Sequence, residues 1–94
     1  MSVRYSTRAK ADLEGIFAYT VEHWGWQQAD MYVDQISRVL SDVTAGCAPI
    51  KPIAERPGLY QVRAGSHYII FTQHDGVIKV RRILHVGMDT LRHV

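Results

Sequence analysis

The sequence predicts an α+β fold in which a hairpin of two helices packs on one face of a small antiparallel sheet, in the order β-α-α-β-β-β. Two observations lead to this prediction. Apolar residues recur at helical spacing over the first half of the chain, and the period changes to strand-like alternation after Gly58. The link between the two helical segments is also very short, which makes them antiparallel neighbours.

The composition indicates one globular domain. The chain has 94 residues, of which 47% are apolar and 21% charged. We therefore expect a single domain over residues 1–94, with a modest core and no room for a separate cofactor-binding domain. The formal net charge of +2 is too small to predict uniform, non-specific binding to nucleic acid.

The cysteine content and the amino terminus favour a cytoplasmic protein. The single cysteine, Cys47, excludes an intrachain disulfide, which is typical of a reducing compartment. We interpret it as a passive thiol in a loop. The first residues lack the apolar segment of a signal peptide, and no apolar run approaches the length that crosses a membrane.

The first half of the chain predicts a short strand and a helix. Residues 2–5 alternate between polar and larger side chains and are expected to join the sheet as an edge or partner strand. Ser6 and Thr7 are suitable N-caps for the first helix, and Gly25 ends it. The apolar stripe of this helix continues to Trp24, which we therefore place in the core. Trp26 lies beyond the stripe. It is either an exposed anchor for a protein partner or a staple that holds the start of the second helix, and the second role is favoured at least as much.

A second helix is expected over residues 27–44. Its apolar side chains fall on one stripe: Ala29, Tyr32, Val33, Ile36, Val39, Leu40 and Val43. Gly46 ends this helix, and the prolines of the next twelve residues predict a loop.

Three strands follow, over residues 59–64, 67–73 and 77–84. Gly65-Ser66 and His74-Asp75-Gly76 are the turns between them. The last strand is apolar at several points on both faces. It is therefore expected to be central, with its second face covered either by the chain itself or by a bound partner.

The last third of the chain is its basic part, with two acidic residues and five cations: Arg63, Lys79, Arg81, Arg82 and Arg92. Strict alternation places Arg81 and Arg82 on opposite faces unless a bulge intervenes. A binding role for these arginines and a structural role are about equally favoured. In the structural role they pair with Glu14, Glu22, Asp89 or the carboxyl terminus.

The histidines do not predict a metal site. None of the five pairs with another at helical spacing, and none has a cysteine partner. His67 and His85 are the best acid–base candidates, since both lie at strand ends near arginines. Structural roles are favoured for both, in the hairpin for His67 and in the turn into the tail for His85. No phosphate-binding loop or nucleophile motif occurs, and no cofactor is expected.

Four short patterns resemble the ParE/RelE toxin superfamily on its ParE branch, in the same order and over nearly the whole chain. They are Tyr5, Ala9, Asp12, Leu13 and Ile16; Tyr19, Trp24, Gly25, Gln28, Ala29 and Tyr32; Gly65-Ser66-His67 with Tyr68-Ile69-Ile70-Phe71; and Arg82-Ile83-Leu84-His85 with Met88-Asp89. The resemblance implies a RelE/ParE-like fold.

The same resemblance implies the toxin of a type II toxin–antitoxin system, of the kind that stabilises plasmids and also occurs on chromosomes. A ParD-like antitoxin would neutralise it by direct binding in a hetero-oligomer. ParE-type toxins trap DNA gyrase on cleaved DNA and block replication, so the chain would be an inhibitor with no catalytic residue. Sequence-specific nucleic-acid binding is not expected.

Two alternatives stay open: a ribonuclease of the RelE branch, which cleaves mRNA on the ribosome, and an inactive binding relative. The sequence departs from the RelE pattern in two ways. Its tail has no tyrosine, and the loop from Pro49 to Pro57 contains only two cations, Lys51 and Arg56. A ribonuclease needs several cations and a proton donor at one phosphate, and arginines on opposite faces oppose that convergence.

The candidate contact residues follow from these expectations. For the target we expect the basic strand end and the tail: Arg63, Arg81, Arg82, His85, Met88, Asp89 and Arg92. A partly disordered antitoxin would fold as a helix and a strand into an apolar groove of the toxin. For the antitoxin we expect the following residues: Trp26, Tyr32, Ile36, Leu40 and Val77.

Overall fold

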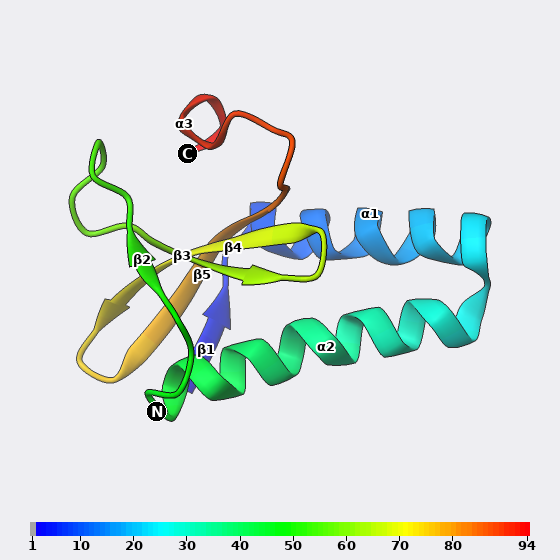
Figure 1. Ribbon diagram of the computed structural model, residues 1–94, viewed down its shortest axis with the longest axis horizontal. Coiled ribbons are helices and arrows are strands. Elements are labelled where there is room, and N and C mark those ends of the chain that lie inside the picture. The colour runs from blue at the N-terminus through cyan, green and yellow to red at the C-terminus, as the bar shows by residue number, and fades with distance from the viewer. Residues whose placement is uncertain (1) are drawn as a thin grey trace.

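The helices and the sheet form two layers, with the helical hairpin on one face of the sheet (Figure 1). The computed structural model describes residues 2–94. Its elements are β1 (Ser2–Tyr5), α1 (Thr7–Trp24), α2 (Trp26–Thr44), β2 (Lys51–Pro52), β3 (Tyr60–Ala64), β4 (His67–His74), β5 (Val77–His85) and α3 (Thr90–His93). The predicted α+β class and order of the main elements are confirmed. The short elements β2 and α3 were not predicted.

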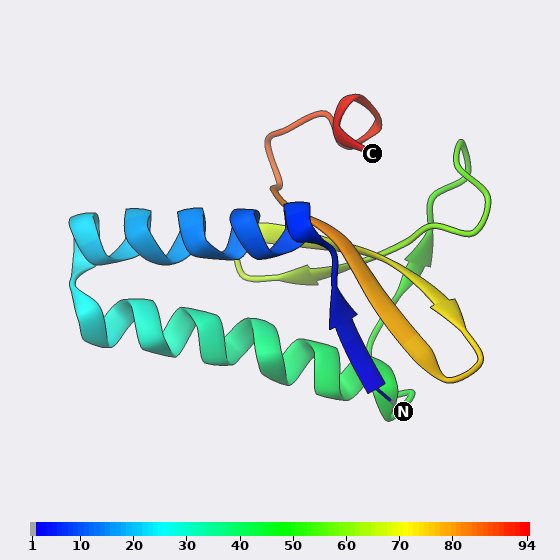
Figure 2. The same cartoon turned by 180° about the vertical axis from the view of Figure 1, so that it is seen from behind.

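The five strands have the order β1-β5-β4-β3-β2. Strands β2 to β5 pair antiparallel, whereas β1 pairs parallel with β5, so the sheet is mixed (Figure 2). Strand β5 therefore lies between β1 and β4, which confirms its predicted central position.

The helical hairpin turns at Gly25, where φ is +89°. This value lies in the region that glycine adopts without steric cost, so the chain reverses here without a longer loop. The turn lies beyond the end of the sheet (Figure 1), and Trp24 is 63% exposed. The prediction that Trp24 belongs to the core is therefore wrong. The apolar stripe continues past the last sheet residue that could cover it.

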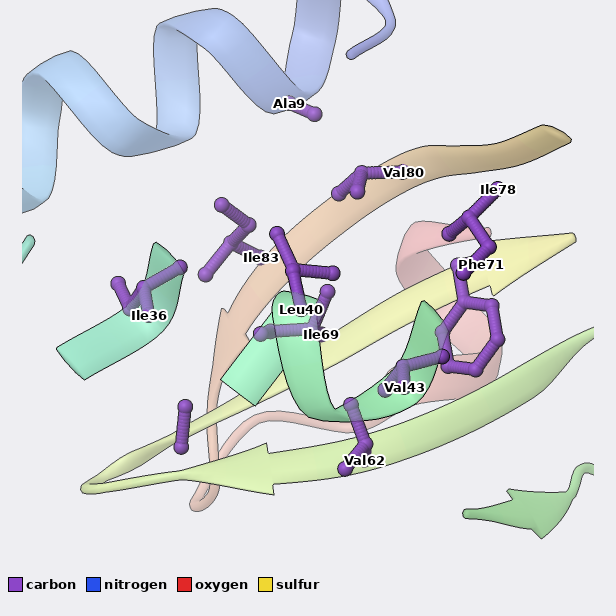
Figure 3. Packing of buried hydrophobic residues seen from close by; sticks show 11 residues of the cluster. Ala9, Ile36, Leu40, Val43, Val62, Ile69, Phe71, Ile78, Val80 and Ile83 are labelled. Carbon is purple, nitrogen blue, oxygen red and sulfur yellow. The ribbon is translucent and has the colours of Figure 1, made fainter. Parts of the chain in front are cut away.

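The main core lies between the helices and the sheet. Figure 3 shows Ile36 and Leu40 of α2 among the side chains of the sheet, and they are 1% and 2% exposed. A second, smaller cluster lies on the opposite face of the sheet and consists of Ile53, Ile70 and Leu84. The chain itself therefore covers both faces of β5, as one of the two alternatives predicted.

The β3–β4 turn packs directly on α2 through Tyr32. Its hydroxyl accepts a hydrogen bond from the amide of Ser66 at 2.9 Å and donates to the carbonyl of Ala64 at 3.3 Å. Gly65, between them, has φ +57°, and an added Cβ would lie 2.7 Å from Cε1 of Tyr32. The close approach of helix and turn therefore requires glycine at this position.

Substitution of Gly65 by alanine is expected to lower the free energy of unfolding by roughly 1–3 kcal/mol, because it adds a clash and an unfavourable φ. The matched control is Gly15→Ala in the middle of α1, where an added Cβ meets no atom within 4 Å. Alanine there is expected to raise the free energy of unfolding by about 0.5–1 kcal/mol. Urea unfolding measures both changes, and equal effects at the two positions would contradict this account.

Candidate functional site

A β-bulge sets the positions of the two adjacent arginines. Ile70 of β4 pairs with Arg82, but the next residue, Phe71, pairs with Val80, so Arg81 has no partner across the ladder. After this extra residue the alternation of β5 is inverted. Val80 and Ile83 both face the helices, whereas Leu84 faces the smaller cluster on the other side. Arg81 and Arg82 consequently line the same pocket, and the expectation that they lie on opposite faces is wrong.

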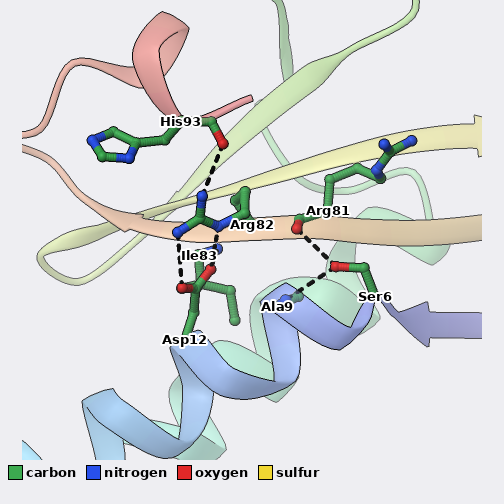
Figure 4. A network of polar contacts seen from close by, with 7 residues as sticks. All are labelled: Ser6, Ala9, Asp12, Arg81, Arg82, Ile83 and His93. Carbon is green, nitrogen blue, oxygen red and sulfur yellow. Dashed lines mark hydrogen bonds and ion pairs between the residues drawn. The ribbon is translucent and has the colours of Figure 1, made fainter.

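Asp12 on α1 holds Arg82 in place (Figure 4). Nε and Nη2 of Arg82 donate to the two carboxylate oxygens of Asp12 at 2.8 and 3.1 Å. Nη1 of Arg82 donates to the backbone carbonyl of His93 at 2.9 Å. The two side chains are only 13% and 16% exposed. Hydrogen bonding to Asp12 raises the pKa of Arg82 above its ordinary value, so the guanidinium remains charged.

The start of α1 also completes the edge of β5. Strand β1 ends at Tyr5, opposite Val80, and leaves this edge of the rest of β5 without a neighbouring strand. The hydroxyl of Ser6 donates to the carbonyl of Arg81 at 2.8 Å, and the amide of Ile83 donates to Asp12 at 2.9 Å. These contacts satisfy backbone groups that an exposed sheet edge would leave unpaired.

The Arg82 guanidinium therefore mainly joins parts of the fold to one another. Its partner is Asp12, which was not among the predicted acidic partners Glu14, Glu22 and Asp89. This geometry supports the structural interpretation for Arg82. Arg81, by contrast, is exposed and remains available to a ligand.

A basic pocket of about 420 Å³ lies beside Arg82. Four arginines line it, together with His93: Arg8, Arg56, Arg81 and Arg82. They come from the start of α1, the loop before β3 and the bulge in β5. Sequence reasoning did not predict the roles of Arg8 and Arg56, because they approach the bulge only through the folding of separate elements.

An apolar groove of about 680 Å³ lies on the other side of the Asp12–Arg82 pair. It runs between the two helices and the ends of β4 and β5, and its lining includes Gly15, Ile16, Tyr19, Trp24 and Met88. Asp12 lines this groove, whereas Arg82 lines the basic pocket. The ion pair is thus the boundary between the two surfaces.

The two predicted acid–base candidates lie in the apolar groove. The rings of His67 and His85 are 5.6 Å apart, and Nδ1 of His67 lies 2.6 Å from the hydroxyl of Tyr32. Burial lowers the pKa of His67, the nearby His85 lowers it further, and Asp12 acts in the opposite direction. Nδ1 of His85 accepts a hydrogen bond from the amide of Gly87 at 3.0 Å. The contact of His85 agrees with its favoured role in the turn into the tail, whereas the His67 side chain is hydrogen-bonded to helix α2 and not to the hairpin.

The remaining candidates for target contact lie outside both surfaces. Nε of Arg63 donates to the carbonyl of Gly65 at 3.0 Å. Asp89 caps α3 by accepting from the amide of Leu91 at 3.2 Å, and Arg92 lies 3.8 Å from its carboxylate. The predicted contact surface is therefore divided: Arg81 and Arg82 line the basic pocket, and His85 and Met88 line the apolar groove.

The candidates for antitoxin contact need one correction. Ile36 and Leu40 are buried against the sheet, so neither offers a surface to a partner in this structure. Tyr32 lines the apolar groove, and Val77 at the start of β5 is half-buried. Trp26 is 68% exposed and lies against the edge of Phe17, with the ring centroids 5.3 Å apart.

Two features of residues 2–94 bear on other classes of function. No cluster of three or more histidine, cysteine, aspartate or glutamate side chains in this range has a geometry that could hold a metal ion. Neither of the long helices in the described part is apolar enough to cross a membrane.

A family model described as the ParE toxin of the type II toxin–antitoxin system parDE matches residues 3–90. The chain belongs to this family. The toxin ParE1 of Mycobacterium tuberculosis is 35% identical to it, with 100% of both chains covered. ParE1 of Caulobacter vibrioides is 32% identical, covering 97% of this chain and 95% of its own. ParE of Escherichia coli is 33% identical, with 92% and 85% covered.

Solved structures of several toxin–antitoxin systems have the same fold. The chromosomal ParDE system of P. aeruginosa gives a TM-score of 0.75 at 24% identity, covering 93% of this chain and 97% of that one. The YoeB–YefM complex of Staphylococcus aureus gives 0.64 at 19% identity, covering 88% and 93%. These likenesses confirm the RelE/ParE-like fold. Together with the family match, they identify the chain as a type II toxin of the ParE family.

The substitution Asp12→Ala is expected to lower the free energy of unfolding by roughly 2–4 kcal/mol, because it leaves the Arg82 guanidinium and the Ile83 amide without their shared acceptor. Asp12→Asn keeps a side-chain acceptor and should cost less. Asp34→Ala, at an exposed position of α2, is the control and should change the stability by less than about 0.5 kcal/mol. Urea unfolding distinguishes these outcomes. A loss for Asp12→Ala as small as that of the control would show that the ion pair contributes little.

Proposed function

We propose that this chain inhibits DNA gyrase and that direct binding of a ParD-like antitoxin neutralises it. The observation that carries the proposal is the match to the ParE toxin family over residues 3–90, with relatives named ParE or ParE1 at 32–35% identity. Gyrase as the target is what the resemblance to ParE-type toxins implies.

The distribution of polar groups supports an inhibitor over an enzyme. Hydrolysis or transfer at a phosphate needs cations and a proton-transferring group at the same atom. Here the arginines line the basic pocket, whereas His67 and His85 line the apolar groove, with the Asp12–Arg82 pair between them. His93 is the one histidine at the basic pocket, and its carbonyl faces Arg82 while its ring points away (Figure 4).

A ribonuclease of the RelE type is the second candidate, and one observation favours it. The bulge at Arg81 brings Arg81 and Arg82 to one pocket, where Arg8 and Arg56 join them. This removes the argument that opposite-facing arginines prevent convergence on a phosphate. The shared fold does not discriminate, because it is found in the RelB–RelE complex of Methanococcus jannaschii, with a TM-score of 0.57, as well as in ParDE.

Addition of the purified chain to a gyrase supercoiling reaction is expected to stop supercoiling and to accumulate gyrase-linked DNA breaks. Gel electrophoresis of the plasmid, with and without protease and detergent, measures both effects. Prior mixing with the antitoxin should restore supercoiling. Full supercoiling at excess toxin would contradict the proposal, and mRNA cuts in a translating extract would favour the ribonuclease instead.

The apolar groove is the surface that we propose for the antitoxin. Tyr19, Trp24 and Met88 line it and are 55%, 63% and 41% exposed, although they are large apolar side chains. Exposed apolar surface of this kind marks a protein contact. A helix with one apolar stripe fits between α1 and the ends of the strands, a common mode of peptide recognition.

The substitution Gly15→Gln tests this placement. Gly15 lines the groove and has open space around it, and glutamine is a good helix former, so the fold should be retained. The side chain would occupy the groove, and the dissociation constant for the antitoxin is expected to rise at least tenfold, about 1.4 kcal/mol.

The control is Glu14→Gln, which introduces the same side chain at a neighbouring exposed position outside the groove lining. Isothermal titration calorimetry with the ParD-like partner measures all three affinities. Unchanged binding by Gly15→Gln would place the antitoxin on another surface.

A further inference from the structure

We propose that the basic pocket binds the phosphodiester backbone of double-stranded DNA. Three exposed arginines, Arg8, Arg56 and Arg81, line this pocket. Within residues 2–94, none of the three forms an ion pair, and no acidic side chain lines the pocket. Val94 also lines the pocket.

The fold uses only one of the four positive charges at this pocket. Arg82 is the cation that the fold uses, and Asp12 neutralises it from the side of the groove. Within residues 2–94, no ion pair offsets the repulsion among the other three. Like charges that converge on one pocket are a cost to stability, and an anionic ligand offsets that cost.

The backbone around the pocket adds further positive potential. Helix α1 begins here with Thr7 and Arg8, and its first turn contains no acidic residue. The first amide groups of a helix have no intrahelical acceptor, and the helix dipole is positive at this end. The hydroxyl-bearing Thr7 and Thr72 also line the pocket and supply neutral donors. Guanidinium groups, hydroxyls and helix amides are the groups that contact phosphate in protein–DNA complexes.

The chemistry of the pocket favours the backbone over the bases. No phenylalanine, tyrosine or tryptophan lines it, and the ring of His93 points away from Arg82 (Figure 4), so the pocket offers no platform on which an unpaired base could stack. The apolar part of the wall is the short segment from Pro57 to Leu59. Contacts to phosphate alone carry no sequence information, which agrees with the expectation that the chain does not read a sequence.

Duplex DNA is the ligand that fits the charge density. It presents one phosphate per roughly 1.7 Å of helix axis, whereas an extended acidic protein segment presents at most one charge per roughly 3.3 Å. The net charge of the chain is only +2, so its affinity for DNA depends on local convergence of arginines. The inference rests on the proposed function only for the source of the DNA, which is the segment held by gyrase.

The experiment measures binding of a short fluorescent duplex by anisotropy over a series of salt concentrations. The double variant Arg56→Ala with Arg81→Ala removes two exposed side chains that the fold does not use. Its affinity at low salt is expected to fall at least tenfold. The slope of log K against log salt is expected to decrease by about two, one for each lost phosphate contact.

The matched control is the double variant Arg4→Ala with Arg38→Ala. It removes the same net charge from exposed positions on β1 and α2 that do not line the pocket. Its salt slope should equal that of the unchanged chain. An equal loss in the two double variants would overturn the inference, because it would show an effect of net charge alone.

Further arms separate the remaining possibilities. Absence of duplex binding at low salt overturns the inference, and so does displacement of the duplex by polyglutamate at equal charge concentration, which would indicate an acidic protein partner. Preference for single-stranded RNA, with cleavage, overturns it in favour of a ribonuclease. Gyrase inhibition without duplex binding rejects this inference alone, whereas duplex binding with unaffected gyrase supports it and rejects the proposed target.

Discussion

The carboxylate of Asp12 is the contact on which the rest of the structure depends. It accepts hydrogen bonds from the Arg82 guanidinium and from the amide of Ile83, and Arg82 in turn binds the backbone of His93. Helix α1, strand β5 and the carboxyl-terminal tail are therefore joined through one charged group. A charged acceptor forms stronger hydrogen bonds than a neutral one, and limited exposure to water increases this effect.

The need for this contact arises from the length of the first strand. Strand β1 covers β5 only from Val77 to Val80, and the longer strand continues to His85. Ser6 and Asp12 satisfy the backbone groups of Arg81 and Ile83. The bulge lies at the place where this change of partner occurs. A strand that twists more strongly at a bulge can present one edge first to β1 and then to a helix.

The sequence was sufficient for the long elements but not for the short elements β2 and α3 or for the site. Periodicity predicted both long helices and the three antiparallel strands, since each pattern is local. The bulge at Arg81 has no such signal, because β5 is apolar on both faces and either register keeps its apolar residues covered. Arg8 and Arg56 were not assigned to a site, because their convergence exists only in three dimensions. Ile36 and Leu40 were assigned to a partner although they belong to the stripe that forms the core.

The two surfaces of this toxin are not independent, because they share one ion pair. Asp12 lines the apolar groove, while the arginine that it holds lines the basic pocket. A ligand that fills the groove removes water from around Asp12, and a carboxylate with less water attracts its guanidinium partner more strongly. The same removal of water further disfavours a charged His67, whose pKa burial already lowers. By linkage, if a ligand in the groove changes the affinity of the pocket for its own ligand by some factor, the ligand in the pocket changes the affinity of the groove by the same factor. The pair of Asp12 and Arg82 thus provides a physical route by which the proposed antitoxin in the groove would affect the proposed binding of DNA by the arginines.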